Sequence, residues 1–300
     1  MHIRNRIMYT RRQVLKSSAL LAALGLADPL ELLASSPRPR FRIGACDWSI
    51  HSANKPAAFD VARKIGLEGV QVSLGNVANQ MHLTRKDVQQ AYKIAAKQAG
   101  LKFSGLAIGE MNSVPYKSDP RTEQWVSDSI DVAKGLGCKV VLLAFFSKGD
   151  LKNDLPGQKE VIKRLQKVAP KAEKEGITLG IESWLSAAEH KEIIDAVGSP
   201  NIKVYYDVAN SHHMGYPIYD EIRWLGKDLI CEFHAKENGN LLGKGKIDFK
   251  EVRKALDDIN YTGWIQIEGA VPPKQPMLES YISNNKFLRS VLDLKPSFKS

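Results

Sequence analysis

Four acidic or imidazole residues, each at the end of an apolar run, are the residues of this chain best suited to chemistry. They are Glu182 in ITLGIES, Asp207 in IKVYYD, His234 in LICEFHAKE and Glu268 in GWIQIEG. Carboxylate oxygens with one imidazole nitrogen suit a single divalent cation such as Mn²⁺, Mg²⁺, Co²⁺ or Zn²⁺. The residue types therefore predict a metal site, and with it an enzyme.

The spacing of these four residues indicates how they would meet. The intervals between them are 25, 27 and 34 residues, about one strand and one helix each. If the apolar runs are neighbouring parallel strands, all four side chains emerge at the same end of one sheet. Taken singly, Asp207 could cap a helix and His234 could be a core histidine. The joint pattern favours a shared site.

Strand-like and helix-like segments alternate along most of the chain. Near-continuous apolar runs of this kind are typical of strands buried on both faces. Eight such runs are found, at residues 41–47, 67–73, 101–108, 139–145, 177–183, 202–207, 229–236 and 264–269. Several of the helical patterns between them end in Gly, where a helix C-cap belongs. Eight alternations predict an α/β fold, a (β/α)8 TIM barrel with its chemistry at the C-terminal strand ends.

The first interstrand segment and one proline bear on the predicted architecture. A doubly wound open sheet is the competing architecture, but the segment CDWSIHSANKP after the first strand lacks the expected Gly-rich phosphate loop. Pro170 lies within a helical pattern and predicts a kink or a break there.

The N-terminal segment differs from the rest of the chain. Arg11 and Arg12, in TRRQVLK, precede the modestly apolar stretch SSALLAALGLADPLELLASS, which resembles a twin-arginine export signal. A basic start to an amphipathic helix is the alternative. Asp28 and Pro29 interrupt the stretch short of the ~20 residues of a membrane span. We expect residues 1–36 to be an export signal and linker, residues 37–300 to be the barrel, and the protein to be periplasmic or secreted without a stable membrane span.

Composition restricts the classes of partner. The chain is 43% hydrophobic and 25% charged, an ordinary globular composition. Residues 1–36 carry five Lys/Arg and two Asp/Glu, so the remainder keeps +7 of the formal net charge of +10. That charge suits anionic ligands, but scattered lysines also keep proteins soluble. No dense basic run with interleaved aromatics is present, so a nucleic-acid partner is not expected. The three cysteines lie in or beside apolar runs and are interpreted as reduced packing residues.

The segments that carry the four residues also resemble a known family. GIES, YYDVANSHHMG, FHAKE, LLGKGKIDF and YTGWIQIEG are similar to segments of the xylose isomerase-like barrels, a family of sugar phosphate isomerases and epimerases. The resemblance covers roughly residues 41–290. It implies that Glu182, Asp207, His234 and Glu268 hold the metal, and that Glu182 and Glu268 also act as an acid/base pair on opposite faces of a sugar.

The resemblance is closest to one branch of the family. Many ketose 3-epimerases have a His three residues after the metal-binding Asp, where this chain has Asn210, and Asp-x-x-Asn is more similar to L-ribulose-5-phosphate 3-epimerases. The candidates for substrate contact are Glu110, Trp184, Asn210, His212 and Lys236. Each also has an ordinary structural interpretation, as a turn, core or surface residue.

These residues predict a sugar isomerase or epimerase. Proton abstraction next to the carbonyl of a ketose or keto-sugar needs a cation to stabilise the enediolate that forms, and carboxylates to move the proton. Return of the proton to the opposite face gives epimerisation, return to the neighbouring carbon gives isomerisation, and loss of a β-leaving group gives elimination. The metal ligands do not choose among these outcomes.

Three alternatives stay open. A 3-keto-glycoside lyase or hydratase would use the same metal and base, and an exported protein is more compatible with an unphosphorylated sugar. A non-catalytic sugar-binding barrel is the second, and a homo-oligomer is compatible with each. A DNA-processing enzyme similar to the apurinic endonucleases is third, but it would need further His after the second and third strands and an Asp-x-x-His pair that this chain lacks.

Overall fold

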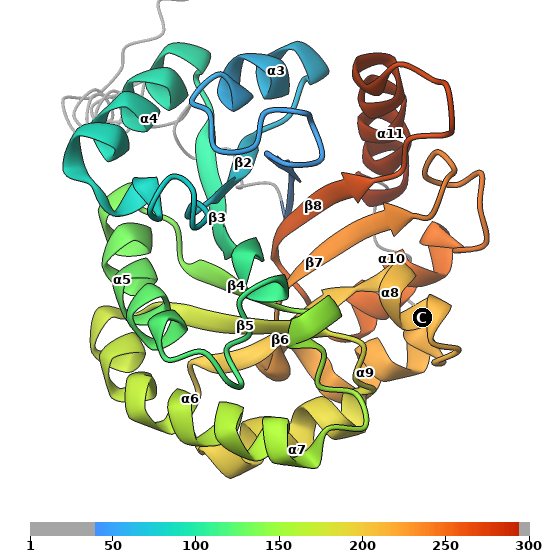
Figure 1. Cartoon of the computed structure of the whole chain (residues 1–300). Helices are drawn as coiled ribbons and strands as arrows, with labels where there is room; N and C mark the ends of the chain where they lie inside the picture. Colours follow the sequence, from blue (N-terminus) through green and yellow to red (C-terminus); the bar gives the residue numbers. More distant parts are fainter. Residues whose placement is uncertain (1–39, 294–300) are drawn as a thin grey trace, which may run out of the picture. The chain divides into compact units, whose positions relative to one another are not determined.

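A computed structural model describes residues 40–293, which form a closed parallel barrel of eight strands in the order β1 to β8. The strands are β1 Phe41–Cys46, β2 Gly69–Ser73, β3 Lys102–Ile108, β4 Val140–Phe145, β5 Thr178–Ser183, β6 Ile202–Asp207, β7 Ile230–Glu237 and β8 Gly263–Gly269. Each pairs in parallel with its neighbours, and β8 closes the barrel against β1. The predicted (β/α)8 barrel is confirmed, and all eight strands lie where the apolar runs placed them (Figure 1).

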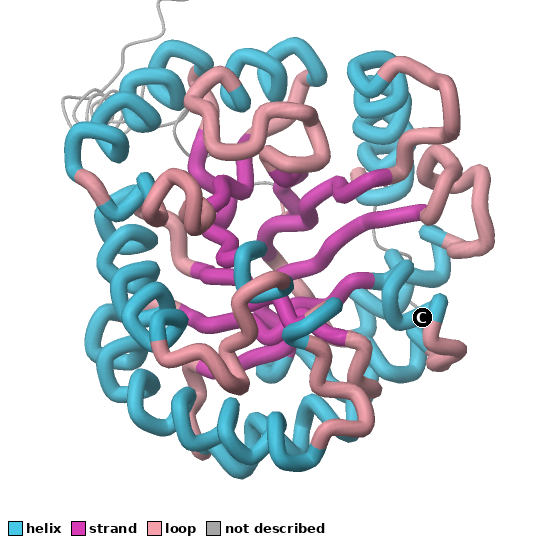
Figure 2. Tube along the Cα trace, viewed as in Figure 1, coloured by secondary structure: helices cyan, strands magenta, loops and turns pink. Residues whose placement is uncertain are grey.

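The helices form a ring outside the strands (Figure 2). They are α3 Ala58–Ile65, α4 Lys86–Ala99, α5 Arg121–Leu136, α6 Leu155–Glu175, α7 Ala187–Val197, α8 Val208–His213, α9 Ile218–Leu229, α10 Phe249–Asp258 and α11 Met277–Leu292. The glycine C-caps expected from the sequence are present: Gly100 and Gly137 end α4 and α5 with φ of +70° and +79°, a conformation that costs glycine little. Helix α6 runs through Pro170 without a break. Pro170 lies on its exposed side, where water can reach the carbonyl left without a partner.

Apolar packing occurs on both sides of the sheet. The larger core, between strands and helices, includes Ile43, Val72 and Phe59, all fully buried. A smaller group inside the barrel includes Leu142, Ala144 and Tyr205. Because the strands are covered on both faces, their ends form a rigid frame on which side chains can be placed precisely.

The export signal predicted for residues 1–36, and the boundary after it, lie outside the described residues. Within residues 40–293, no helix combines the length and apolar character needed to cross a membrane. All three cysteines are free thiols, as their apolar surroundings predicted.

A buried histidine joins the end of β5 to α7. Ser186 caps α7 in a capping box with Glu189, and His190 lies one residue further on. Its Nδ1 is 3.0 Å from the carbonyl oxygen of Ser186, and its Nε2 is 2.9 Å from Ser183 Oγ. The backbone carbonyl can only accept a hydrogen bond, so Nδ1 donates and Nε2 accepts from the serine hydroxyl. Burial lowers the pKa of His190 to about 4, which keeps the ring neutral.

Because His190 stays neutral in the folded protein, we expect the free energy of unfolding of the barrel to fall in acid. The unfolded chain takes up a proton at His190 as pH falls below about 6.5, whereas the folded protein does not until about 4. Stability is therefore lost as pH falls through this window, by at most about 3 kcal/mol at 1.36 kcal/mol per pKa unit. Urea unfolding at pH 7 and pH 4.5 should show a smaller difference for His190→Gln than for the wild type. An equal difference in both proteins would contradict the assignment.

Candidate active site

The four candidate ligands meet at one end of the barrel. Glu182, Asp207, His234 and Glu268 come from β5, β6, β7 and β8, and each offers a ligand atom that lies within 4.8 Å of the other three. Adjacent parallel strands bring their C-terminal ends to the same edge, so the register of the barrel creates this cluster from residues 25 to 34 positions apart. Three of these side chains are at most 5% exposed and Glu268 is 14% exposed.

The two carboxylate oxygens of Asp207 differ in their surroundings: one caps a helix, and the other faces the cluster of candidate ligands. Its Oδ1 caps α8 by accepting hydrogen bonds from the N–H groups of Ala209 and Asn210, at 2.8 and 2.9 Å. Its Oδ2 is buried and has no hydrogen-bond partner within the described residues. Burial raises the pKa of Asp207 to about 7, although the charge of Lys236 partly opposes the shift. A buried carboxylate oxygen without a partner is costly unless a cation meets it.

His234 is oriented so that one ring nitrogen faces the carboxylates. Its Nδ1 is 2.9 Å from Glu182 Oε1, 3.5 Å from Glu268 Oε2 and 3.8 Å from Asp207 Oδ2. On the opposite edge, Nε2 lies 3.0 Å from Gln71 Oε1. The amide nitrogen of Gln71 donates to the Tyr205 hydroxyl at 3.1 Å, so Oε1 is the atom that faces the ring. A hydrogen on Nε2 leaves the Nδ1 lone pair for the cluster, as for a metal-binding histidine.

The electrostatics of the cluster favour a positive charge at its centre. Burial lowers the pKa of His234, but nearby negative charges, those of Glu182 and Glu268 among them, raise it well above the ordinary value. Burial raises the pKa of Glu268, but His234 and Lys236 outweigh it and hold this pKa at about 2. The oxygen-rich donor set, the unpartnered Asp207 oxygen and the orientation of His234 all fit a bound divalent cation.

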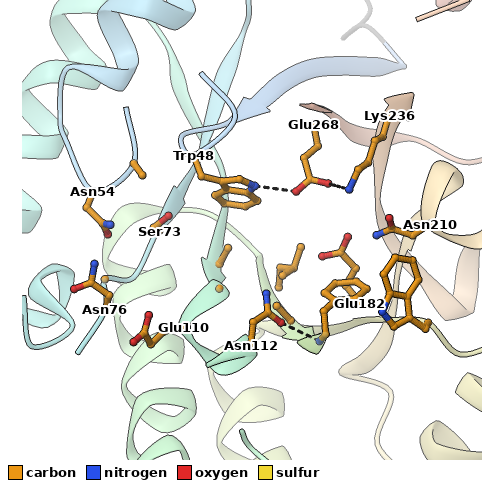
Figure 3. A pocket seen from close by; sticks show the side chains of 18 residues that line it. Trp48, Asn54, Ser73, Asn76, Glu110, Asn112, Glu182, Asn210, Lys236 and Glu268 are labelled. Atoms are coloured by element: carbon orange, nitrogen blue, oxygen red, sulfur yellow. Dashed lines mark hydrogen bonds and ion pairs between the residues drawn. The ribbon is translucent and has the colours of Figure 1, made fainter. Parts of the chain in front are cut away.

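Two further side chains contact Glu268. The indole N–H of Trp48 donates to Oε1 at 2.8 Å, and the Lys236 ammonium lies 2.8 Å from Oε2 (Figure 3). Lys236 also lies 3.4 Å from Asp207 Oδ2. Lys236 thus supplies part of the positive charge that the cluster needs, and it is not the surface lysine that its ordinary interpretation implied.

Most of the predicted substrate residues line one pocket above the cluster. The pocket has a volume of about 480 Å³, within the range of small-molecule sites. Glu110, Trp184, Asn210 and Lys236 line it together with Glu182 and Glu268. His212 does not line this pocket. On helix α8 it lies two residues after Asn210, which is roughly 200° around the helix axis, so the two side chains point in opposite directions.

Two residues that contact His234 were missed in the sequence. Gln71 orients His234, and Cys46 lies beneath it, with Sγ 3.3 Å from Nε2 and close enough to form a second grouping with His234 and Glu268. Burial raises the pKa of Cys46 to about 12, so its thiol is protonated and donates to Gln71 at 3.1 Å. A polar residue in the middle of a strand, as Gln71 is in GVQVS, was the available signal.

Within residues 40–293, no other grouping of three or more His, Cys, Asp or Glu approaches the geometry of a metal site. The two groupings found share His234 and Glu268, so they describe one centre.

Comparison with known proteins identifies the family. Residues 59–291 match the family model described as the xylose isomerase-like TIM barrel. The chain belongs to this family. The expected family resemblance is therefore confirmed over most of the barrel.

Several of the relatives are named as epimerases. The chain is 24% identical to 2-epi-5-epi-valiolone 7-phosphate 2-epimerase of an Actinoplanes species over 72% of this chain and 82% of that protein. It is 23% identical to a putative L-ribulose-5-phosphate 3-epimerase of Escherichia coli, over 75% and 87% of the two chains. Among solved structures, D-psicose 3-epimerase in the presence of D-fructose has a TM-score of 0.70 at 20% identity, and the match covers 84% of this chain and 99% of that chain.

The position of Asp207 Oδ2 at the cluster predicts that its negative charge contributes to metal affinity. Asp207→Asn keeps an oxygen to cap α8 but removes the charge that faces the cluster. We expect Mn²⁺ affinity, measured by calorimetry, to fall by more than the ~10–100-fold typical of residues that only support a ligand.

Asp248 provides the control because it caps α10 in the same way, accepting from the N–H groups of Lys250 and Glu251. Asp248→Asn should leave Mn²⁺ affinity unchanged. Equal losses in the two variants would show that capping, and not ligation, explains the effect.

Proposed function

We propose that the protein is a divalent-metal-dependent sugar epimerase or isomerase that moves a proton next to the carbonyl of a ketose or keto-sugar. The observation that carries the proposal is the cluster of Glu182, Asp207, His234 and Glu268, which opens into a pocket of small-molecule size. The epimerases among its relatives support the same class of reaction.

In this proposal the four side chains hold one cation, Mn²⁺, Mg²⁺, Co²⁺ or Zn²⁺. When bound, the cation would polarise the substrate carbonyl and so make the neighbouring C–H bond more acidic. Asp207 and His234 are the more deeply placed ligands and do not line the pocket, whereas Glu182 and Glu268 do. The two glutamates therefore have the additional access to substrate that proton transfer requires.

Glu182 and Glu268 enter the pocket from different sides (Figure 3). One carboxylate takes the proton from carbon, the C–H electron pair enters the carbonyl system as an enolate, and the other carboxyl group returns a proton from the opposite face. Trp48 and Lys236 hold Glu268 by contacts to its two oxygens. Fixed in this way, Glu268 loses little orientational freedom during the proton transfer.

The comparisons leave the phosphorylation state of the substrate open. Two of the relatives are named for phosphorylated substrates, whereas the solved structure is that of a psicose epimerase. Asn210 lines the pocket next to the cluster and can donate to a sugar hydroxyl. A lyase acting on a 3-keto-glycoside would use the same residues and remains distinguishable by its product.

The experiment that tests the proposal is solvent exchange in D₂O followed by NMR. Metal-loaded protein is incubated with free ketoses and keto-sugars, and deuterium should appear on the carbon next to the carbonyl of at least one of them. Glu182→Gln and Glu268→Gln should each slow exchange by about 10²–10⁴-fold, the usual contribution of general acid–base catalysis. Metal content is measured in parallel, and saturating Mn²⁺ is supplied to variants that have lost it.

Glu192→Gln is the control for this experiment, because Glu192 is an exposed carboxylate on α7. It should exchange at the wild-type rate. Turnover that survives both pocket substitutions with the cation still bound would exclude the two glutamates as the acid and base. Binding of a sugar without exchange would favour the non-catalytic barrel.

We also propose that the protein is exported through the twin-arginine route, which is supported by the TRRQVLK segment. Charge-conserving substitution of both Arg11 and Arg12 by Lys should retain the protein in the cytoplasm, because the signal requires the arginine pair itself. Cell fractionation measures the distribution. Substitution of Arg4 and Arg6 by Lys changes the same number of residues outside the motif, and it should leave export intact.

A further inference from the structure

The pocket has a second polar end, away from the metal-ligand cluster. Asn54 follows β1, Asn76 follows β2, and Glu110 and Asn112 lie on the short 3-10 helix Gly109–Asn112 after β3. All four line the pocket. In Figure 3, Asn54, Asn76 and Glu110 lie on the other side of Trp48 from Lys236 and Glu268, and Asn112 lies between Glu110 and Glu182. We refer to Asn54, Asn76, Glu110 and Asn112 as the amide end.

The amides at this end are held in defined orientations. Asn112 Oδ1 accepts a hydrogen bond from the backbone N–H of Phe146 at 2.9 Å, and Asn76 Oδ1 accepts from that of Asn79 at 3.0 Å. Since a backbone N–H can only donate, the contacting atom of each amide is its oxygen, and the NH₂ groups remain available as donors.

An acceptor is also available at the amide end. Glu110 contributes a carboxylate whose one contact in the described part of the chain is a long hydrogen bond, 3.4 Å, from the Val77 N–H. Fixed donors beside a free acceptor match hydroxyl groups, which donate and accept at once.

The charges that line the pocket argue against a phosphate. Three of its lining side chains are carboxylates, Glu110, Glu182 and Glu268, and its one cationic side chain is Lys236. Lys236 lies at the cluster, paired with Glu268 at 2.8 Å and near Asp207 at 3.4 Å. A phosphate at the amide end would face Glu110 without any cation, although such groups are usually bound by Arg, Lys or helix N-termini.

Part of the pocket lining is apolar and aromatic. It includes Trp48, Phe146 and Leu142, with Ala107 and Ala144. Aromatic faces of this kind pack against the C–H faces of sugar rings while hydroxyl groups meet polar partners at the edges.

From these contacts we propose that the substrate is a neutral disaccharide that contains a ketose, with its second polyhydroxylated ring at the amide end. The assignment of the reacting ring to the cluster rests on the proposed function. That the ligand is uncharged and carries a second ring is inferred from the amide end alone.

The test compares ligands that share one ketose. D-fructose, D-fructose 6-phosphate and isomaltulose carry hydrogen, phosphate or glucosyl on the same oxygen, and leucrose, lactulose and turanose move the second ring to other oxygens. Calorimetry with the Mg²⁺-loaded protein should give at least one disaccharide an affinity about tenfold or more above that of fructose, the equivalent of about 1.4 kcal/mol. Fructose 6-phosphate should bind no more tightly than fructose. Tighter binding of the phosphate, or no disaccharide above fructose, would overturn the proposal.

Two variants locate the second ring. Glu110→Ala removes an acceptor, and Asn112→Asp keeps the contact with the Phe146 N–H but replaces the NH₂ donor by an acceptor. Each should weaken the binding of the preferred disaccharide by up to about tenfold and leave the affinity for fructose nearly unchanged, in line with the loss of one hydrogen bond. Glu192→Ala, an exposed control, should change neither. Equal losses for disaccharide and fructose would place the second ring elsewhere and overturn the assignment.

Measurements of binding and of solvent exchange test the neutral ligand and the enzymatic function separately. A disaccharide preference that depends on Glu110, without solvent exchange in any substrate, would reject the enzymatic function and retain the neutral ligand. Exchange with a preference for fructose 6-phosphate would reject the neutral ligand and retain the enzyme.

Discussion

Three carboxylates, two buried and one largely buried, lie with an imidazole within 4.8 Å of one another at one end of the barrel, and they require a compensating positive charge. Lys236 supplies part of it, 2.8 Å from Glu268 and 3.4 Å from Asp207. The second oxygen of Asp207 still has no hydrogen-bond partner in the described chain. A divalent cation would satisfy this requirement, and the rigid strands fix the places of its candidate ligands, so the proposed chemistry and the fold depend on the same arrangement.

Different halves of the barrel provide the two ends of the pocket. The second half, β5 to β8, provides the charged cluster, and the loops after β1 to β3 provide the neutral amides and Glu110. Trp48 connects the halves, because it follows β1 and donates its indole N–H to Glu268 on β8 at 2.8 Å. In barrels of this type the strand ends carry the chemistry while the loops select the substrate. The same division explains why the family match supports a reaction class and the amide end supports a particular ligand.

Much of the architecture could be predicted because its signals are local. A strand buried on both faces is apolar throughout, and a helix that ends at Gly100 or Gly137 needs a residue that tolerates a positive φ. Pro170 was less informative, because the exposed side of α6 tolerates it. Asp207 shows how two local interpretations can both hold, since Oδ1 caps α8 and Oδ2 faces the cluster. Gln71 was missed because its partner, His234, lies 163 residues away in the sequence.

The sequence by itself determined the barrel, the four candidate ligands and the strand ends that carry them, because hydrophobic periodicity and residue type are local properties of the chain. Only the tertiary structure decided which side chains share one pocket. It showed that Asn210 lines the pocket while His212 does not, since the rotation of α8 separates them. It also brought Asn54, Asn76, Glu110 and Asn112 together from three loops, a juxtaposition that closure of the barrel creates and that no local pattern contains.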